Sequence, residues 1–448
     1  MSASADHLCV LVHGLWGNPS HLQSLSTSLR EQYPEDKLHI LLVKRNAGSF
    51  TYDGIETGGE RVAHEIEEHL EELSQKGTPV KKISVIGYSL GGLIARYAIG
   101  LLYHKGIFER VEPVNFTTFA TPHLGVRTPL TGRLNQIWNV LGARTLSMSG
   151  RQLFAIDNFR DSGRPLLAVL ADPGSIFINA LKSFKNRSLY ANIVNDRTVV
   201  YYTAGISQTD PFKNLEDVEI NYLPGYDDVI VDGENPVSAK EPTALPAFSQ
   251  RLTQSTRNFF GTLPIAAFLI IFIPIGSSIF LANSAIQSVR SRQRIQLHES
   301  GKAGFDFGNY RIPLISNMRQ EVEDMFENVN NAQNQEFLPA GSEVLASPTQ
   351  PRRRTRTHSI PKISAPLDSD VDSIDEQKEG IKLDFSTLAL TADQFAMIES
   401  LDNVGFKKHP VHIHKVRHTH AAIIRRMTKK SFDEGLSVAR HWLDNFEL

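Results

Sequence analysis

The feature that most constrains the fold is a serine set between two glycines, where a short apolar run meets a long one. Residues 83–86 are apolar enough for a buried strand, and residues 91–102 are apolar almost all round, as in a helix packed between other layers. The segment between them, Gly87-Tyr88-Ser89-Leu90-Gly91, matches G-x-S-x-G, the nucleophile elbow. Side chains at the glycines would collide with the neighbouring strand and helix. We therefore expect a sharp strand-to-helix turn that presents Ser89 as a nucleophile.

A second turn rich in small residues follows the first expected strand, residues 8–12. It reads His13-Gly14-Leu15-Trp16-Gly17. Hydrolases with a nucleophile elbow place part of their oxyanion hole in such a turn, where backbone N–H groups must face the developing negative charge. We expect the donors to be the N–H groups of Leu15 and Leu90, with Trp16 as an alternative to Leu15.

The order of elements predicts an α/β protein with a mostly parallel sheet. Further apolar runs at residues 38–43, 114–120 and 189–194 suit strands. Between the strand at 38–43 and the elbow, apolar residues recur at the spacing of a helix. Strands that alternate with helices form parallel sheets covered on both faces. Residues 126–181 show an irregular helical pattern that fits either a cap or peripheral packing.

Two further residues would complete a catalytic triad with the serine. Asp196 lies just past the strand expected at 189–194, where the triad acid is usually placed. An Asx turn is the structural alternative there, and Asp227 and Asp228 are the other candidates for the acid.

The base is expected in the histidine-rich segment 407–424. His420 stands directly before an apolar run that can begin the closing helix, and His418 is the alternative. His123 comes too early for the chain order Ser, Asp, His of this class of enzyme and is expected to be structural. Because no carboxylate or cysteine lies among the histidines, we expect no metal site.

The longest apolar stretch is Phe259 to Ile286. No charged residue occurs between Arg257 and Arg290, and a run of this length exceeds the roughly 18 apolar residues that indicate a membrane segment. Pro264 and Pro274 would break a spanning helix, and arginines flank the stretch on both sides. Since Asp196 and His420 lie on opposite sides of the stretch in sequence, a hairpin or shallow insertion with both ends on the cytosolic side is expected. A helix buried in the protein is the alternative.

The composition also bears on nucleic-acid binding and on the compartment in which the protein works. The 47 Lys and Arg residues balance 49 Asp and Glu residues, which gives no general signal for nucleic-acid binding. The only cysteine, Cys9, lies in an apolar run and is expected in the core of a protein from a reducing compartment. The N-terminus lacks the pattern of a signal peptide. Residues 431–446 predict an amphipathic helix that turns Leu436 and Trp442 toward the core.

These motifs together resemble the fungal putative serine esterase family of the α/β-hydrolase superfamily, and within it the lipid-droplet phospholipases of yeasts and filamentous fungi. The segments that carry the resemblance are His13–Gly17, Thr51–Ile55, Gly87–Gly92, Phe119–His123 and His420–Ala421. The resemblance implies an α/β-hydrolase fold, a triad at Ser89, Asp196 and His420, and hydrolysis of glycerophospholipids at a lipid surface.

The expected organisation has five parts. Residues 1–255 form the first part of the hydrolase core with its helical cap, and 256–290 a hydrophobic segment that inserts into a membrane or lipid droplet. Residues 291–330 connect this segment to a disordered linker at 331–378, whose composition is charged, Ser-rich and poor in aromatics. Residues 379–448 return to the hydrolase core and carry the histidine.

The expected function is therefore a serine lipid hydrolase of the phospholipase or lysophospholipase type. We expect it on lipid droplets or the endoplasmic reticulum, facing the cytosol and without a cofactor. An acylglycerol lipase or esterase with the same triad is the first alternative, and a non-catalytic membrane-bound scaffold is the second.

Overall fold

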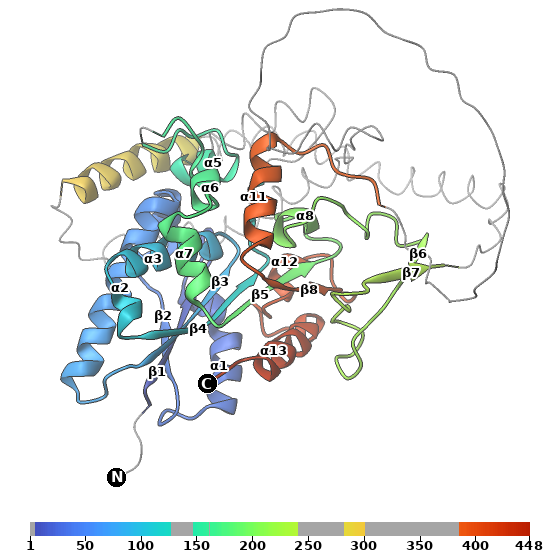
Figure 1. Cartoon of the computed structure of the whole chain (residues 1–448), viewed down its shortest axis with the longest axis horizontal. Helices are drawn as coiled ribbons and strands as arrows, with labels where there is room; N and C mark the ends of the chain where they lie inside the picture. Colours follow the sequence, from blue (N-terminus) through green and yellow to red (C-terminus); the bar gives the residue numbers. More distant parts are fainter. Residues whose placement is uncertain (1–4, 127–146, 161, 241–281, 301–384) are drawn as a thin grey trace, which may run out of the picture.

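A computed structural model describes residues 5–126, 147–160, 162–240, 282–300 and 385–448 (Figure 1). Its centre is a parallel sheet with the strand order β2-β1-β3-β4-β5-β8. The strands are β1 (His7–Val12), β2 (His39–Leu42), β3 (Lys82–Tyr88), β4 (Glu112–Phe119), β5 (Asn186–Asn192) and β8 (Lys407–Val411). Because all six run in one direction, their carboxyl ends meet at one edge of the sheet.

Helices cover both faces of this sheet and give the protein two hydrophobic cores. One core lies under α2 (Ile55–Gln75), α3 (Leu90–His104), α7 (Ile176–Ser183) and α11 (Ala392–Asp402). The other lies under α1 (Gln23–Gln32) and α13 (Glu434–Asp444). Burial on both sides explains why β1 and β3 are nearly continuous apolar runs. The expected α/β architecture with a mostly parallel sheet is confirmed.

The chain between β4 and β5 contains the helices α5 (Ser147–Leu153), α6 (Leu166–Leu170) and α7. α5 lies against the 3-10 turn η2 (Gly48–Tyr52) and the start of α2. The Ser149 hydroxyl accepts a hydrogen bond from the N–H of Gly54 at 3.0 Å, and the side-chain amide oxygen Oε1 of Gln152 accepts one from the N–H of Ile55 at 2.6 Å. These contacts supply the cap that α2 lacks in its own sequence, since Gly54 has no side chain to serve as an N-cap.

After β5 the chain leaves the sheet and returns to it. It forms α8 (Tyr201–Ala204), the antiparallel pair β6 (Val218–Ile220) and β7 (Val237–Ala239), a helix over residues 282–299, and α11. Strand β8 then pairs with β5, and α12 (Thr419–Ala422) and α13 follow. The remaining short turns are η1 (Pro19–Leu22), η3 (Ile107–Glu109) and η6 (Lys430–Phe432).

The apolar stretch falls mostly outside the described residues, as does the expected linker at 331–378. Within the ranges that are described, no helix is long and apolar enough to cross a bilayer. The last residues of the stretch, 282–286, begin the helix over 282–299, which runs across the expected boundary at residue 290.

Two smaller expectations can also be compared with the structure. Cys9 is fully buried in β1, which confirms its place in the core. The terminal helix does bury Trp442, but the prediction for Leu436 is wrong, because this side chain is 41% exposed. α13 begins at Glu434 rather than at residue 431, and Leu436 is not among the residues that it buries.

Candidate active site

Ser89 occupies the turn between β3 and α3 in a strained backbone conformation. Its φ is 55° and its ψ is −131°, a region that residues other than glycine rarely adopt. A Cβ atom on Gly87 would lie 2.3 Å from the Cα atom of Gly92, and one on Gly91 would lie 2.2 Å from the carbonyl oxygen of Val12. The elbow therefore requires both glycines of the motif, because any side chain there would force the helix away from the sheet.

Three of the predicted residues meet at the carboxyl edge of the sheet. The Ser89 Oγ atom lies 3.0 Å from Nε2 of His420, and Nδ1 of His420 lies 2.9 Å from Oδ2 of Asp196. The serine follows β3, the aspartate follows β5 and the histidine follows β8, and all three side chains are buried. Because the carboxylate only accepts, Nδ1 of His420 carries the proton, and Nε2 is the ring atom that can accept the serine proton.

Asp196 is fixed by donors other than the histidine. Its Oδ1 atom accepts hydrogen bonds from the N–H groups of Thr198 at 3.1 Å and Val199 at 2.8 Å. Its Oδ2 atom also accepts one from the side-chain amide of Asn192 at 2.8 Å. The Asx turn considered as an alternative is thus present together with the contact to His420, and the two arrangements use different oxygens of one carboxylate.

The loop that carries His420 is tied to the residue before the nucleophile. The Tyr88 hydroxyl donates to the backbone carbonyl of His420 at 3.0 Å, and the two rings lie 5.1 Å apart. His420 itself lies inside the short helix α12 rather than just before a helix. Sequence reasoning missed Tyr88 and Asn192. Their positions, next to the serine and at the end of β5, were the available signal.

The turn after β1 packs directly against the nucleophile. A Cβ atom on Gly14 would lie 2.7 Å from the Cβ atom of Ser89. The N–H of Trp16 donates to the hydroxyl of Thr51 at 3.0 Å, so the alternative that assigned Trp16 as an oxyanion donor is wrong for this conformation. In the described part of the chain, the N–H groups of Leu15 and Leu90 donate to no other backbone group. Leu90 follows Ser89 directly, and Leu15 follows Gly14, which packs against Ser89.

The other candidates for the base and the acid of the triad lie outside this contact. His418 is exposed, and Asp227 and Asp228 lie on the surface, where Asp227 accepts a hydrogen bond from Ser437 at 2.7 Å. His123 is fully buried, with its Nε2 atom 3.0 Å from the Thr118 hydroxyl. Burial, with the nearby Arg96, lowers the pKa of His123 well below its usual value, so this ring is a neutral structural group.

No three His, Cys, Asp or Glu side chains converge on a metal-binding arrangement within the ranges the structure describes. The rings of His412 and His414 lie 3.8 Å apart, yet burial, with the neighbouring His414, lowers the pKa of His412 to about 4. The Tyr222 hydroxyl, at 2.7 Å, is bonded to Nδ1 of His412. The histidine-rich segment is therefore used for packing and for one triad contact.

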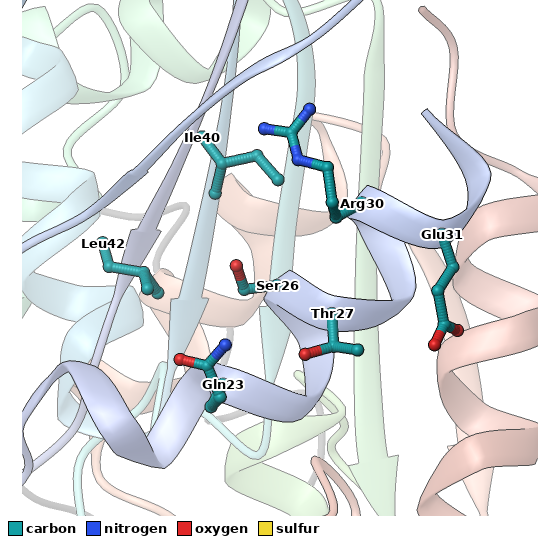
Figure 2. A pocket seen from close by; sticks show the side chains of 7 residues that line it. All are labelled: Gln23, Ser26, Thr27, Arg30, Glu31, Ile40 and Leu42. Atoms are coloured by element: carbon teal, nitrogen blue, oxygen red, sulfur yellow. The ribbon is translucent and has the colours of Figure 1, made fainter. Parts of the chain in front are cut away.

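A hollow of about 370 Å³ lies between α1 and the edge strand β2 (Figure 2). Ser26, Thr27 and Arg30 of α1 line it together with Ile40 and Leu42 of β2. The Arg30 guanidinium is already bound by the backbone carbonyls of Tyr33 and Leu38. None of the residues that line this hollow belongs to the Ser89–His420–Asp196 site.

The parallel sheet, the strained elbow serine and the Ser–Asp–His chain order define a protein of the α/β-hydrolase class. Residues 2–209 match the family described as "Putative serine esterase (DUF676)".

Curated relatives agree with the family. "Putative lipase ROG1" of Saccharomyces cerevisiae is 33% identical over 219 residues, which cover 48% of this chain and 30% of the relative. "Putative lipase C4A8.10" of Schizosaccharomyces pombe is 30% identical over 212 residues, 45% of this chain and 26% of the relative. The chain thus spans about a third of the length of the curated relatives it matches.

Among solved structures, "Phospholipase PlaB from Legionella pneumophila" is 14% identical, with a TM-score of 0.27, over 46% of this chain and 42% of that one. A thioesterase from prodiginine biosynthesis in Streptomyces coelicolor is 23% identical, with a TM-score of 0.21, over 32% of this chain and 56% of that one.

Proposed function

We propose that the protein is a serine lipid hydrolase that cleaves acyl ester bonds of glycerophospholipids. The observation that carries the proposal is the continuous contact from Ser89 Oγ through His420 to Asp196, at 3.0 and 2.9 Å. In this mechanism His420 takes the proton from Ser89 as the hydroxyl attacks the ester carbonyl, and Asp196 stabilises the imidazolium.

The negative charge that forms on the carbonyl oxygen is stabilised by the N–H groups of Leu15 and Leu90. Leu90 is the first residue of α3, so its N–H has no partner inside the helix and the helix N-terminus adds a favourable potential. The imidazolium of His420 then gives its proton to the leaving alcohol oxygen as the ester C–O bond breaks. Water attacks the acyl-enzyme with His420 as its base, and the ring returns this proton to Ser89 Oγ as the fatty acid is released. No step requires a cofactor.

Two observations bear on the substrate. The sequence resembles phospholipases of lipid droplets, and a long apolar stretch lies between the residues of the triad, which supports a substrate at a lipid surface. The curated relatives are named lipases, which supports acylglycerols as the second candidate. The assembled Ser–His–Asp contact argues against a non-catalytic scaffold.

The decisive assay incubates the purified full chain with a panel of phospholipids, lysophospholipids and acylglycerols beside Ser89→Ala. We expect fatty-acid release by the native protein, fastest from a phospholipid, and a loss of several orders of magnitude in Ser89→Ala. Activity of Ser89→Ala within about tenfold of the native protein would exclude this mechanism. Equal far-UV circular dichroism of the two proteins is the control for folding.

A second pair of variants tests the base. His420→Ala should lose activity to a similar extent, because no other buried ring reaches Ser89 in the described structure. His418→Ala is the matched control and should keep most of the activity, since this side chain is exposed. If His418→Ala is inactive and His420→Ala is active, the two roles are exchanged.

The proposed location is the cytosolic face of lipid droplets or the endoplasmic reticulum, with Phe259 to Ile286 inserted as a hairpin or lying shallowly. Since Asp196 and His420 meet in one site, both ends of the stretch must lie on one side of the membrane. Tags at residues 245 and 300 should both be cleaved by protease in sealed, cytosol-side-out microsomes. Protection of one tag alone would contradict this topology. Deletion of the stretch should release the protein into the cytosol.

A further inference from the structure

The helix over residues 282–299 is amphipathic, but it turns its apolar side to solvent. Ile286, Val289 and Leu297 are 52%, 56% and 39% exposed, and they are three of the seven large exposed hydrophobic side chains in the described part of the chain. The buried side of the same helix is polar and consists of Ser284, Gln287, Ser291 and Arg294. A surface helix of a globular protein normally has the opposite orientation.

The exposed residues form one strip. Val289 and Leu297 lie three and eleven residues after Ile286, which places the three side chains on one face at 3.6 residues per turn, with the exposed Gln293 between Val289 and Leu297. The exposed Arg290 and Arg292 lie beside this strip. An apolar face with flanking arginines is the pattern of a helix that lies in the interface of a membrane, because arginine reaches the phosphate groups while the apolar side chains enter the acyl region.

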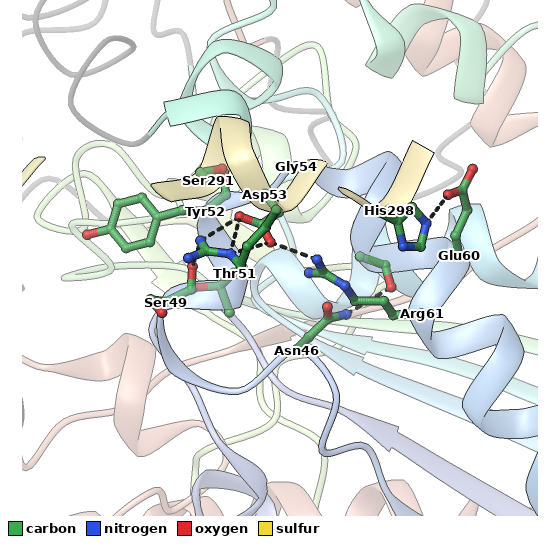
Figure 3. A network of polar contacts seen from close by, with 12 residues as sticks. Asn46, Ser49, Thr51, Tyr52, Asp53, Gly54, Glu60, Arg61, Ser291 and His298 are labelled. Carbon is green, nitrogen blue, oxygen red and sulfur yellow. Dashed lines mark hydrogen bonds and ion pairs between the residues drawn. The ribbon is translucent and has the colours of Figure 1, made fainter. Parts of the chain in front are cut away.

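Contacts on the polar side fix this orientation (Figure 3). The Arg294 guanidinium donates to the carboxylate of Asp53 at 2.6 and 2.9 Å and to the backbone carbonyl of Ser49 at 2.9 Å. Asp53 is fully buried and also binds Arg61 at 2.8 Å. One turn further along, His298 lies 2.6 Å from Glu60.

These ion pairs explain why the apolar strip stays outside. Turning the helix over would set Ile286 and Val289 against a buried carboxylate and would leave Asp53 paired with Arg61 alone. Charged groups that have left water must keep their partners. The observed orientation, with the polar side inward and the apolar side in solvent, is therefore the stable one.

We infer that the outward face of this helix, defined by Ile286, Val289 and Leu297, binds a phospholipid surface. The charge-free sequence that begins after Arg257 runs directly into the helix, so the chain enters it from its most apolar stretch. The helix also lies close to the site, since Ser291 donates to the carbonyl of Tyr52, and the neighbouring Thr51 holds the turn beside Ser89. The inference rests on the proposed lipid substrate and names the surface that meets it.

The test uses an environment-sensitive fluorophore on single cysteines in a Ser89→Ala background, so that no lipid is hydrolysed. The native Cys9 is fully buried and its burial raises the thiol pKa, which makes it unreactive to the label. Val289→Cys and Leu297→Cys carry the probe on the strip. Leu436→Cys is the matched control, because this side chain is 41% exposed on α13, on the opposite face of the sheet.

The labelled full-length proteins are mixed with phosphatidylcholine vesicles that contain phosphatidylserine. We expect a blue shift and a rise in emission at positions 289 and 297 and no change at 436. In unlabelled protein, Ile286→Asn/Val289→Asn/Leu297→Asn should weaken vesicle binding by about tenfold or more. A tenfold change corresponds to about 1.4 kcal/mol, which is less than three apolar side chains contribute when they leave water.

Three results would overturn the inference. The first is unchanged emission at 289 and 297 while the protein floats with the vesicles. The second is a blue shift without vesicles that grows with protein concentration, which would mean that a second copy covers the strip. The third is a blue shift without vesicles at every dilution, which would mean that the chain's own residues cover it. Because the readout does not depend on hydrolysis, failure of the proposed reaction in the active protein would be seen separately.

Discussion

Replacing Asp196 with asparagine should stop catalysis while leaving the fold almost intact, and the hydrogen bonds around the carboxylate show why. Oδ1 accepts from the N–H groups of Thr198 and Val199. The amide introduced by Asp196→Asn must keep its oxygen on that side, because its NH₂ group would otherwise face two donors.

The NH₂ group then points at Nδ1 of His420, where the carboxylate oxygen was. His420 can only accept this hydrogen bond if Nδ1 loses its proton, so the proton moves to Nε2 and faces Ser89. A ring in that tautomer cannot take the serine proton. In serine-hydrolase triads this change lowers kcat by about 10⁴, which corresponds to about 5 kcal/mol of transition-state stabilisation.

The fold is protected because Asn192 can adapt. Its side-chain oxygen has no hydrogen-bond partner, so a rotation of its amide turns that oxygen toward the new NH₂ group. The free energy of unfolding should therefore change by about 1 kcal/mol or less. Asp196→Ala differs, because it leaves two backbone N–H groups without an acceptor at a cost of about 1–3 kcal/mol each.

The assay measures kcat on a short-chain p-nitrophenyl ester and unfolding by urea for both variants. Asp227→Asn is the control, since that carboxylate is exposed and bonded to Ser437. The reasoning is refuted if Asp196→Asn keeps activity within about tenfold of the native protein. It is also refuted if Asp227→Asn loses activity to the same degree.

Three further predictions follow from the same structure. Thr51→Val should lower kcat about tenfold with little change in KM, because the N–H of Trp16 loses its acceptor beside the proposed oxyanion site. Thr51→Ser keeps the hydroxyl and should have the native kcat, and an unchanged kcat in Thr51→Val would contradict the prediction. Gly91→Ala should give inactive or insoluble protein, since the new Cβ would lie 2.2 Å from a backbone carbonyl of β1, and soluble, active protein would show that the elbow can shift. Burial lowers the pKa of His7 and His441 to about 4, so both rings are neutral in the fold but bind protons near pH 6.5 when the chain is unfolded. The free energy of unfolding should therefore fall, as the pH drops from 6.5 toward 4, by up to about 1.4 kcal/mol per histidine and pH unit. Urea midpoints that do not change between pH 7 and 5 would contradict this.

The local parts of the fold were predictable because their signals lie within a few residues of one another. The glycines around Ser89, the apolar run before it and the apolar helix after it specify the elbow without reference to any distant residue. The same holds for the burial of Cys9 in β1 and for the two strands that pair with β1, which are β2 and β3.

Choices between similar residues depended on long-range packing. The expected strand before Asp196 favoured it over Asp227, and the apolar run after His420 favoured it over His418. Neither local signal shows which of these side chains is buried. The structure separates them because β5 and β8 are neighbours in the sheet, so their carboxyl ends bring Asp196 and His420 together.

The orientation of the helix over residues 282–299 illustrates the limit most clearly. From the sequence we expected a hydrophobic segment up to residue 290 and a connecting segment after it, not this helix; once the helix forms, the spacing of its residues gives it an apolar and a polar side. Only the tertiary structure decided which side faces the protein, since the buried carboxylate of Asp53 lies more than two hundred residues earlier in the chain and offers Arg294 a partner that no local pattern records. Turning the apolar side inward would take Arg294 away from a carboxylate that is already buried, and a buried charge that loses a partner is strongly destabilising; that cost exists only in the folded chain.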